Sequence, residues 1–386
     1  MRKMNVLFVL TQLELGGAQT QLLDLIRQID QDHYTLFLFT AQEGWLKEEA
    51  LSIHGLKIHF SKYLQPSIYL PKDLLAMIEM VRFIKKNKID IVHTHGSKAG
   101  ILGRFAGAAA KVKIVIHTVH GWSFNDFQNS LVRQLYIGLE RLSAKFTDKI
   151  IAVSNHDIQK GLAHKIGSGS QYVLVRYGIP RAQFGMKDST IRKELGISPE
   201  AWVIGTIACF KPQKAPEDFV RFAFLTRQAF PKARFLWVGD GMLRKKIEKL
   251  ITQFNLEPQF ILLGWRRDIP RILSAMDAFV LTSLWEGLPV AVLEAMVSQV
   301  PVVATCTGGI SEVISEGETG FLVSCHDMAS MLEKVRVLLQ DPPLKERILR
   351  SAKQCVNEQF DTKTMVKAHE NLYQKLVQAK GMEHAL

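Results

Sequence analysis

Short β-type runs alternate with stretches of helical periodicity along almost the whole chain, and they do so in two blocks. The first block holds runs at 5–10, 34–39, 56–60, 89–95, 113–119, 149–154 and 172–176. The second holds runs at 202–208, 234–239, 260–264, 278–283, 300–305 and 320–323. Alternating β and α units form parallel sheets covered by helices on both faces. We therefore predict an α/β protein with two Rossmann-like, doubly wound parallel-sheet domains that face each other across a cleft.

A polar connector around 178–200 interrupts the alternation and separates the blocks. We predict an N-terminal Rossmann-like domain over 1–180 and a C-terminal one over 181–361. The last segment, 362–386, is expected to hold a helix over about 362–379 that is able to pack back on the N-terminal domain. A chain of 386 residues suits two domains of ordinary size.

The composition is that of a soluble protein, with 47% apolar and 22% charged residues and no apolar run of membrane-spanning length. The opening MRKMNVLFVL imitates a signal peptide, but its apolar run is short and no small-residue cleavage site follows, so we predict a first strand. Four widely spaced cysteines without a C-x-x-C pair indicate a reducing, cytoplasmic setting and argue against zinc.

The positive charge is concentrated in the first half. Of the 49 Lys and Arg and 37 Asp and Glu, residues 1–185 carry 23 and 14, which leaves 26 and 23 for the rest. Such an excess indicates an anionic partner for the first half, and nucleic acid, a phosphate-bearing substrate and an anionic membrane all fit. Ordinary solvated Lys and Arg explain it equally well.

Ligands of open parallel sheets bind beyond the carboxyl ends of the strands, so the loops that follow strands are the candidate sites. The first such loop contains Gly16 and Gly17 directly before a helix. Glycines let a backbone approach a ligand, and a helix start offers N–H groups to an anion. The pattern is not G-x-G-x-x-G, so it gives an NAD site little support, and a purely structural turn is as good an explanation.

Histidines gather at two neighbouring strand ends, in HTHGSKAG (93–100) and HTVHGWSF (117–124). We expect His93 and His117 to be core residues and His120, which lies past its strand, to be functional. A zinc site is a minor alternative because no matching Cys or carboxylate motif accompanies the histidines. Lys98 and Arg104 are expected to add positive charge at this edge.

A second group of charged residues follows the first strand of the second block, in ACFKPQKAPEDF (208–219). Two ammonium groups, Lys211 and Lys214, stand on a loop stiffened by prolines and just before a helix. That arrangement suits a diphosphate, although a solvated basic loop is an equally good explanation.

Two glutamates flank an apolar stretch in WEGLPVAVLEAM (285–296). Pro289 favours a helix start, which gives Gly287 and Leu288 free N–H groups, and these together with Glu286 are able to hold sugar hydroxyls. Glu294 would lie on an otherwise apolar helix face and should be desolvated. A ribose diol would offset that cost with two hydrogen bonds of ~1.5–3 kcal/mol each.

These motifs together resemble those of the retaining family 4 glycosyltransferases of the GT-B fold, as found in bacterial polysaccharide assembly. The resemblance rests on LGGAQ, HTHGSKAGILGR, HTVHGWSF, ACFKPQKAPEDF, VGDG, LGWRRDIP, the spacing of Glu286 and Glu294, and VATCTGGISEVISEGETGFLV. They occur in family order and cover nearly the whole chain. Two departures stand out. Cys209 occupies a position where many relatives have Arg, with Lys211 as its substitute, and Tyr177 precedes Gly178 where relatives often have Asn.

The resemblance implies a role for each site residue. Glu294 would hold the nucleotide ribose and Glu286 the donor sugar, with Gly287 and Leu288 at the same helix start. His120 would lie beside the transferred sugar and Arg266 near the base, while Gly16 and Gly17 would approach the diphosphate and the acceptor. Lys211 and Lys214 would stabilise the leaving diphosphate, which makes His120, Lys211, Lys214 and Glu286 the catalytic candidates.

The implied enzyme is a retaining hexosyl- or N-acetylhexosaminyltransferase that needs neither cofactor nor metal. Its donor would be a nucleotide-sugar, UDP-sugar rather than GDP-sugar, and its acceptor a glycan or polyprenyl-linked sugar in cell-surface polysaccharide or lipopolysaccharide assembly. It would be cytoplasmic, and peripheral on the inner face of the membrane if the anionic partner is lipid. The D-x-D at Asp30–Asp32 follows the first predicted helix, away from the ligand edge, and we expect it to end that helix.

Two alternatives remain open from the sequence. A sugar-nucleotide 2-epimerase of the same fold would need acid and base carboxylates from both halves, whereas the first half offers His and Lys. A basic nucleic-acid-binding protein would interleave aromatic residues with its basic stripe, which this chain does not, so we expect no nucleic-acid partner.

Overall fold

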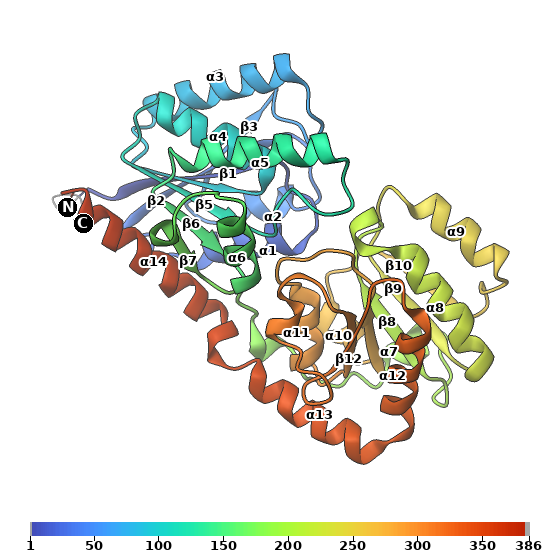
Figure 1. The fold of residues 1–386 in the computed structure, drawn as a ribbon. Helices are drawn as coiled ribbons and strands as arrows, with labels where there is room; N and C mark the ends of the chain where they lie inside the picture. The colour runs from blue at the N-terminus through green and yellow to red at the C-terminus, as the bar shows by residue number, and fades with distance from the viewer. Residues whose placement is uncertain (1, 383–386) are drawn as a thin grey trace. The chain divides into compact units, whose positions relative to one another are not determined.

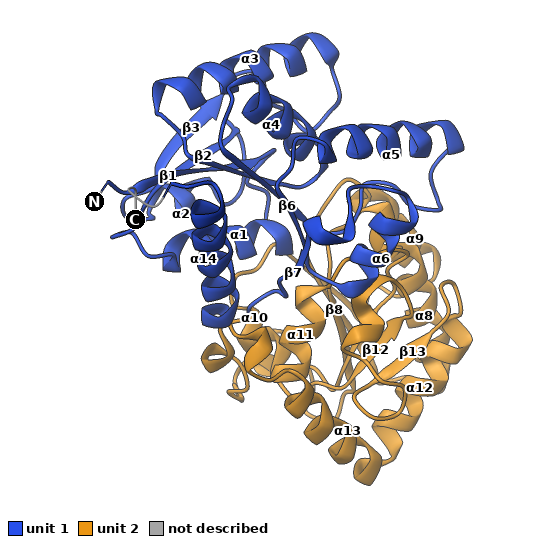
Figure 2. Cartoon of the chain, turned by 60° about the vertical axis from the view of Figure 1, so that its left-hand side comes forward, with its two compact units in different colours: residues 1–178, 362–386 blue, residues 179–361 orange. Residues whose placement is uncertain are grey.

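The computed structural model describes residues 2–382, and the chain divides into two compact units (Figure 2). Unit 1 comprises Met1–Gly178 and Thr362–Leu386, and unit 2 comprises Ile179–Asp361. Residues 1 and 383–386, including the end of the predicted C-terminal segment, lie outside the described residues. No helix within 2–382 combines the length and the apolar character that crossing a bilayer requires.

Unit 1 contains a seven-stranded parallel sheet with the order β3-β2-β1-β4-β5-β6-β7 (Figure 1). Its strands are β1 (Met4–Leu10), β2 (Tyr34–Ala41), β3 (Lys57–Ser61), β4 (Ile91–His95), β5 (Ile114–Val119), β6 (Lys149–Ala152) and β7 (Tyr172–Leu174). The opening residues are thus a buried central strand, as predicted. Val-, Ile- and Phe-rich runs suit strands that are covered on both faces.

Helices cover both faces of this sheet. They are α1 (Gly17–Gln28), α2 (Lys47–Leu51), α3 (Leu70–Lys86), α4 (Ser97–Ala109), α5 (Ser130–Ala144), α6 (Asn155–Ala163) and α14 (Thr362–Ala379), with the 3-10 turn η1 (Gly169–Gln171). One core cluster joins the sheet to α1, α2 and α14, and another joins it to α3 and α4. The terminal helix α14 packs against α1 and contributes the fully buried Tyr373.

Unit 2 repeats the plan with a six-stranded parallel sheet of order β10-β9-β8-β11-β12-β13. Its strands are β8 (Val203–Ile207), β9 (Arg234–Val238), β10 (Phe260–Gly264), β11 (Ala278–Leu281), β12 (Val302–Thr305) and β13 (Phe321–Val323). Its helices are α7 (Ile191–Glu194), α8 (Pro216–Ala229), α9 (Arg244–Gln253), α10 (Ile269–Leu273), α11 (Val290–Val297), α12 (Met328–Gln340) and α13 (Pro342–Cys355). Four 3-10 turns complete it: η2 (Arg181–Gln183), η3 (Pro212–Lys214), η4 (Gly308–Glu312) and η5 (Glu358–Phe360).

Both sheets reverse their order beside the first strand, between β1 and β4 and between β8 and β11. Ligands of open parallel sheets bind outside the carboxyl ends of the strands, at such a switch point. The predicted fold class is confirmed: all thirteen predicted strands are present, and every pairing between named strands in residues 2–382 is parallel.

Candidate active site

The loops after β8 and β11 meet at the switch point of unit 2 through an ion pair. The Lys214 ammonium group contacts the Glu286 carboxylate, and their side chains are only 17% and 6% exposed. Lys214 ends η3, and Glu286 lies between β11 and α11. The structure therefore brings together two predicted site residues that are 72 positions apart in sequence.

Main-chain bonds hold these two loops in register. Leu284 N–H donates to the Gln213 carbonyl at 2.8 Å, and the Gln213 side-chain amide donates to the Trp285 carbonyl, also at 2.8 Å. The Thr282 hydroxyl donates to the Lys214 carbonyl at 2.9 Å. Because these contacts involve backbone atoms, they hold the loop of Lys214 in place independently of the ion pair with Glu286.

A third loop, after β12, packs against the main chain of Glu286. Gly309 N–H donates to the Gly287 carbonyl at 2.7 Å, and the Thr307 hydroxyl donates to the Leu284 carbonyl at 3.0 Å. A Cβ atom added at Gly308, whose φ is +56°, would lie 1.9 Å from the Glu286 carbonyl oxygen. This close approach requires glycine, so the third loop braces the strand end that carries Glu286.

The helix that follows, α11, begins at Val290 with Pro289 as its N-cap, one residue later than predicted. The reason is that Pro289 keeps an extended ψ of 115°, while its fixed φ of −74° still directs the chain into the helix. No side chain in residues 2–382 caps this helix. Its first N–H groups, beside Gly287 and Leu288, are therefore placed to bind an anion or a hydroxyl oxygen.

Glu294 lies on α11 among buried neighbours, which include Leu293 and Ala295, but the residue itself is only partly buried. Its exposure is intermediate, so the apolar helix shields Glu294 from solvent only in part. A half-buried carboxylate on an apolar helix remains within reach of an entering ligand.

Two further predicted residues of unit 2 are not members of the ion pair. Lys211 is the exposed N-cap of η3, three residues before Lys214. Arg266 follows the edge strand β10, two strands from β8, and its guanidinium makes two bonds to Asp268, at 2.7 and 2.6 Å. The Asp268 carboxylate raises the pKa of Arg266. Arg266 is thus held in one orientation by a fork-to-fork pair.

In unit 1, Gly16 and Gly17 stand where the chain enters α1 after the central strand. Gly16 is the N-cap, with extended backbone, and no side chain in the described chain caps the helix. The first N–H groups of α1 are therefore not taken up by a side-chain cap. The D-x-D at Asp30–Asp32 lies past the other end of α1, before β2, which confirms that it ends this helix.

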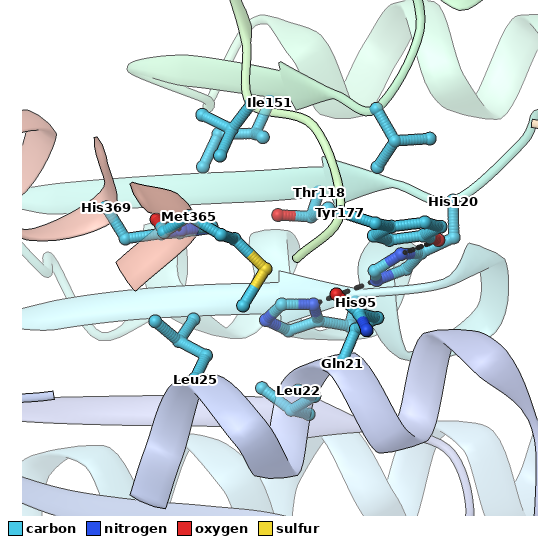
Figure 3. Close-up of a pocket in the computed structure, with 12 residues that line it drawn as sticks. Gln21, Leu22, Leu25, His95, Thr118, His120, Ile151, Tyr177, Met365 and His369 are labelled. Atoms are coloured by element: carbon cyan, nitrogen blue, oxygen red, sulfur yellow. Dashed lines mark hydrogen bonds between the residues drawn. The ribbon is translucent and has the colours of Figure 1, made fainter. Parts of the chain in front are cut away.

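His120 lies just past β5 and belongs to a chain of ring contacts (Figure 3). Its Nε2 is 3.0 Å from Nδ1 of His95, the last residue of β4, and its Nδ1 is 2.7 Å from the Tyr177 hydroxyl. If His95 Nδ1 carries the proton between the rings, His120 Nδ1 is protonated and donates to the Tyr177 hydroxyl. If His120 Nε2 carries it, the Tyr177 hydroxyl donates to His120 Nδ1. Both ring nitrogens of His120 are therefore occupied within unit 1, and its ring is fixed.

A small cavity of about 20 Å³, room for roughly one water, adjoins these rings. His95, Thr118, His120, Tyr177 and His369 line it together with Gln21 and apolar residues (Figure 3). Within the described chain, Nε2 of His95 is buried without a hydrogen-bond partner. Desolvation lowers the pKa of His120 to about 3 and that of His369 to about 4, so both rings are neutral near pH 7.

The remaining histidines of the cluster are core residues, as predicted. His93 Nδ1 and Nε2 lie 2.6 and 2.7 Å from the hydroxyls of Tyr373 and Thr118, and His117 Nδ1 lies 2.9 Å from that of Thr94. Burial lowers the pKa of His93, His95 and His117 well below 6.5.

The prediction that Arg104 adds positive charge at the ligand edge is wrong. Arg104 is fully buried, and its guanidinium pairs with Glu140 of α5 at 2.6 Å. The ammonium group of Lys98 is likewise neutralised, by Asp73 at 2.5 Å. Both cations hold neighbouring helices to α4 and are not presented to a ligand.

Sequence reasoning missed three residues that shape the site. Gln213 ties the two switch-point loops of unit 2, and Gln21 exchanges two hydrogen bonds with the main chain of Gly178, at 2.7 and 2.9 Å. That exchange fixes the backbone next to Tyr177, the partner of His120. Tyr177 could have been noticed in the sequence, because it stands before Gly178 where relatives often have Asn. No sequence pattern pointed to Gln21 or Gln213.

Two doubly wound parallel sheets, one in each compact unit, are the architecture of the GT-B class of glycosyltransferases. Two family profiles match the chain accordingly: Glycosyltransferase Family 4 over residues 15–179 and Glycosyl transferases group 1 over residues 187–355. The chain belongs to this glycosyltransferase family, which selects a transferase over the epimerase and nucleic-acid-binding alternatives.

Individual relatives agree with the family. The chain is 32% identical over 336 residues, 86% of each chain, to the UDP-Gal:alpha-D-GlcNAc-diphosphoundecaprenol alpha-1,3-galactosyltransferase of Escherichia coli. It is 26% identical to the N,N'-diacetylbacillosaminyl-diphospho-undecaprenol alpha-1,3-N-acetylgalactosaminyltransferase of Campylobacter jejuni, over 92% of this chain and 94% of that one. The crystal structure of Anabaena Alr3699/HepE with UDP-glucose superposes with a TM-score of 0.84 at 21% identity, covering 96% and 100% of the two chains.

The buried histidines make unit 1 sensitive to acid. Their native pKa lies below the value of ~6.5 in the unfolded chain, so stability is complete above pH 6.5 and is lost as the pH falls toward 4. Each fully neutral histidine should cost about 1 kcal/mol of unfolding free energy between pH 7 and 5.5. Urea titrations at both pH values should show that His369→Asn loses less stability on acidification than the wild type, by about that amount. Equal losses in both proteins would contradict the assignment.

Proposed function

We propose that the protein is a retaining, metal-independent glycosyltransferase that moves a hexose or N-acetylhexosamine from a UDP-sugar, rather than a GDP-sugar, to a polyprenyl-diphosphate-linked glycan. The observation that carries the proposal is the Lys214–Glu286 ion pair, held at the switch point of unit 2 beside the uncapped start of α11. An ammonium group suits a diphosphate and a carboxylate suits sugar hydroxyls, and this pair offers both at the same sheet edge.

The ion pair suits donor binding because its two members can exchange partners. A diphosphate carries more negative charge than Glu286 and competes for the Lys214 ammonium group. Lys214 then turns to the phosphate, and Glu286 is released to accept hydrogen bonds from the donor sugar. The main-chain bonds through Gln213 and Thr282 keep both loops in place during this exchange. The exposed Lys211 adds a second positive charge on the same loop.

The remaining predicted contacts complete a nucleotide-sugar site. Glu294 accepts hydrogen bonds from the two ribose hydroxyls, and Arg266 lies near the base of the nucleotide. In unit 1, the uncapped start of α1 at Gly16 and Gly17 offers N–H groups that suit a phosphate or an acceptor oxygen. Both ring nitrogens of His120 are engaged, by His95 and Tyr177. His120 therefore contacts the transferred sugar as a neutral group in a fixed position and does not transfer a proton to it.

The chemistry follows from this charge distribution. The bond between the anomeric carbon and the diphosphate oxygen breaks, and negative charge develops on the leaving UDP. Lys214, Lys211 and helix N–H groups stabilise that charge at a site organised before reaction. The acceptor hydroxyl attacks from the face that the diphosphate leaves and gives its proton to a phosphate oxygen, so the anomeric configuration is kept. Positive side chains supply the charge that a divalent metal would otherwise supply.

The acceptor and the setting are proposed from the relatives. The names of both enzymes compared above describe sugars on diphospho-undecaprenol as acceptors and alpha-linked products. Retention gives an alpha-linked product from an alpha-linked sugar nucleotide. We therefore place the protein in cell-surface polysaccharide or lipopolysaccharide assembly, in the cytoplasm and peripheral on the inner face of the membrane that holds the lipid-linked acceptor.

The activity is tested with a panel of UDP-, GDP- and ADP-sugars and a short-chain GlcNAc-diphospho-polyprenol acceptor. Mass spectrometry should detect one added hexose or N-acetylhexosamine with a UDP-sugar, and NMR should assign an alpha linkage. A beta linkage would contradict retention, and absence of transfer from every donor to this acceptor would contradict the proposed reaction.

Lys214→Ala should lower turnover by ~10²-fold, the loss expected when one preorganised electrostatic group is removed. Lys232→Ala is the matched control, because Lys232 is a largely exposed lysine of the same unit that pairs with Glu200. Equal turnover of the two lysine variants would refute the role of Lys214.

Wild-type turnover should also survive EDTA. Loss of activity in EDTA that Mg²⁺ or Mn²⁺ restores would refute metal independence.

A further inference from the structure

Exposed apolar side chains of the described chain are concentrated on two segments of unit 1. Of the seventeen large hydrophobic side chains that are exposed in residues 2–382, twelve lie within 68–78 or 127–146. They are Ile68, Tyr69, Leu70, Leu74, Leu75, Ile78, Phe127, Leu131, Val132, Leu135, Leu142 and Phe146. Single exposed apolar residues are ordinary, but such a concentration marks a surface that binds a protein, a membrane or a ligand.

These side chains are additional to the faces that anchor the helices. Helix α3 packs on the sheet through Ala76, Met80 and Ile84. Its residues Leu70 and Leu74, one helical turn apart, are 77% and 54% exposed.

Helix α5 has the same two-sided pattern. It is anchored by the buried Ile137 and Ala144. Its residues Leu131 and Leu135 are 79% and 61% exposed. Both α3 and α5 pack against α4, so they belong to one helical layer (Figures 1 and 2).

The acidic side chains of the two helices are paired on their inner sides. On α3, Asp73 pairs with Lys98 at 2.5 Å, and Glu79 lies 2.9 Å from His59. On α5, Glu140 pairs with the buried Arg104.

The exposed charged residues of α3 and α5 are all basic: Lys72, Arg82, Lys85, Lys86 and Arg141. Asp126, in the segment before α5, is exposed but pairs with Arg133 at 3.0 Å. The outer faces are therefore both apolar and positively charged.

We infer that these twelve apolar side chains and five basic residues form a docking surface for an anionic lipid bilayer. Apolar side chains flanked by Lys and Arg are the combination that binds a helix to the interface of an anionic membrane. A second copy of the chain would present the same positive charge and would be repelled. This partner rests on the proposed function, since a polyprenyl-linked acceptor lies in a bilayer, but the binding itself requires no catalysis.

Vesicle co-sedimentation of the full chain tests the surface directly. Wild-type protein should sediment with equimolar phosphatidylcholine and phosphatidylglycerol vesicles at low salt, and far less with phosphatidylcholine alone. Binding should weaken above ~0.15 M salt, where the Debye length is ~8 Å. Leu70→Ser, Leu74→Ser, Leu131→Ser and Leu135→Ser combined should lower partitioning at least ~10-fold, because each removes apolar area from the interface.

The matched control combines Met186→Ser with Met242→Ser, which removes two exposed side chains of unit 2 and should leave binding unchanged. Circular dichroism should show native folding for both variants. Wild-type protein that stays in the supernatant with anionic vesicles at low salt overturns the inference, as does a quadruple variant that binds like the wild type. A dimer seen by light scattering that only the quadruple variant loses, without vesicle binding, would make the surface a contact between copies instead.

Catalysis is scored separately with a short-chain, water-soluble acceptor. Absence of transfer to that acceptor alongside intact vesicle binding would count against the proposed function and leave the docking surface standing. Transfer without vesicle binding would count against the surface alone.

Discussion

Each sheet reverses its strand order beside its first strand, and Gly16, Gly17, Lys211, Lys214 and Glu286 all follow a strand that borders that reversal. The loops after β8 and β11 meet at the switch point of unit 2, and those after β1 and β4 leave the sheet on the two sides of the reversal in unit 1. Within each sheet, parallel strands point the following helix starts to one edge, and the starts of α1 in unit 1 and of α11 in unit 2 have no side-chain cap among the described residues. Lys214 and Glu286 then bind each other across the reversal in unit 2.

Strands and helices were predictable because each is specified by neighbouring residues. β-branched runs, the periodicity of α14 and the proline before α11 are local signals, and the structure follows them to within a few residues. Pairings between distant residues were not predictable: Lys214 meets Glu286 across 72 positions, and His120 meets Tyr177 across 57. Arg104 was misassigned for the same reason, since its burial depends on Glu140 of another helix, 36 residues away.

Charge is handled differently in the two units. In unit 1, the acidic side chains of α3 and α5 contact Lys98, His59 and Arg104 on the inner sides of these helices, and basic residues lie outside. It also keeps a group of histidines buried and neutral around His120. Unit 2 instead keeps a mostly buried ion pair, Lys214–Glu286, at its ligand edge. A cation held by a carboxylate is available to a stronger anion, which is the property that binding a diphosphate requires.

The most direct test of this account is the affinity for UDP, measured by calorimetry, of Glu286→Gln and Glu294→Gln against the wild type. If Glu286 competes with the diphosphate for Lys214, its substitution should tighten UDP binding by up to ~5-fold, which corresponds to ~1 kcal/mol for an ion pair. Glu294→Gln should weaken UDP binding by ~10-fold or more, because the ribose loses a charged acceptor. Unchanged affinity in both variants, or equal weakening in both, would contradict the account.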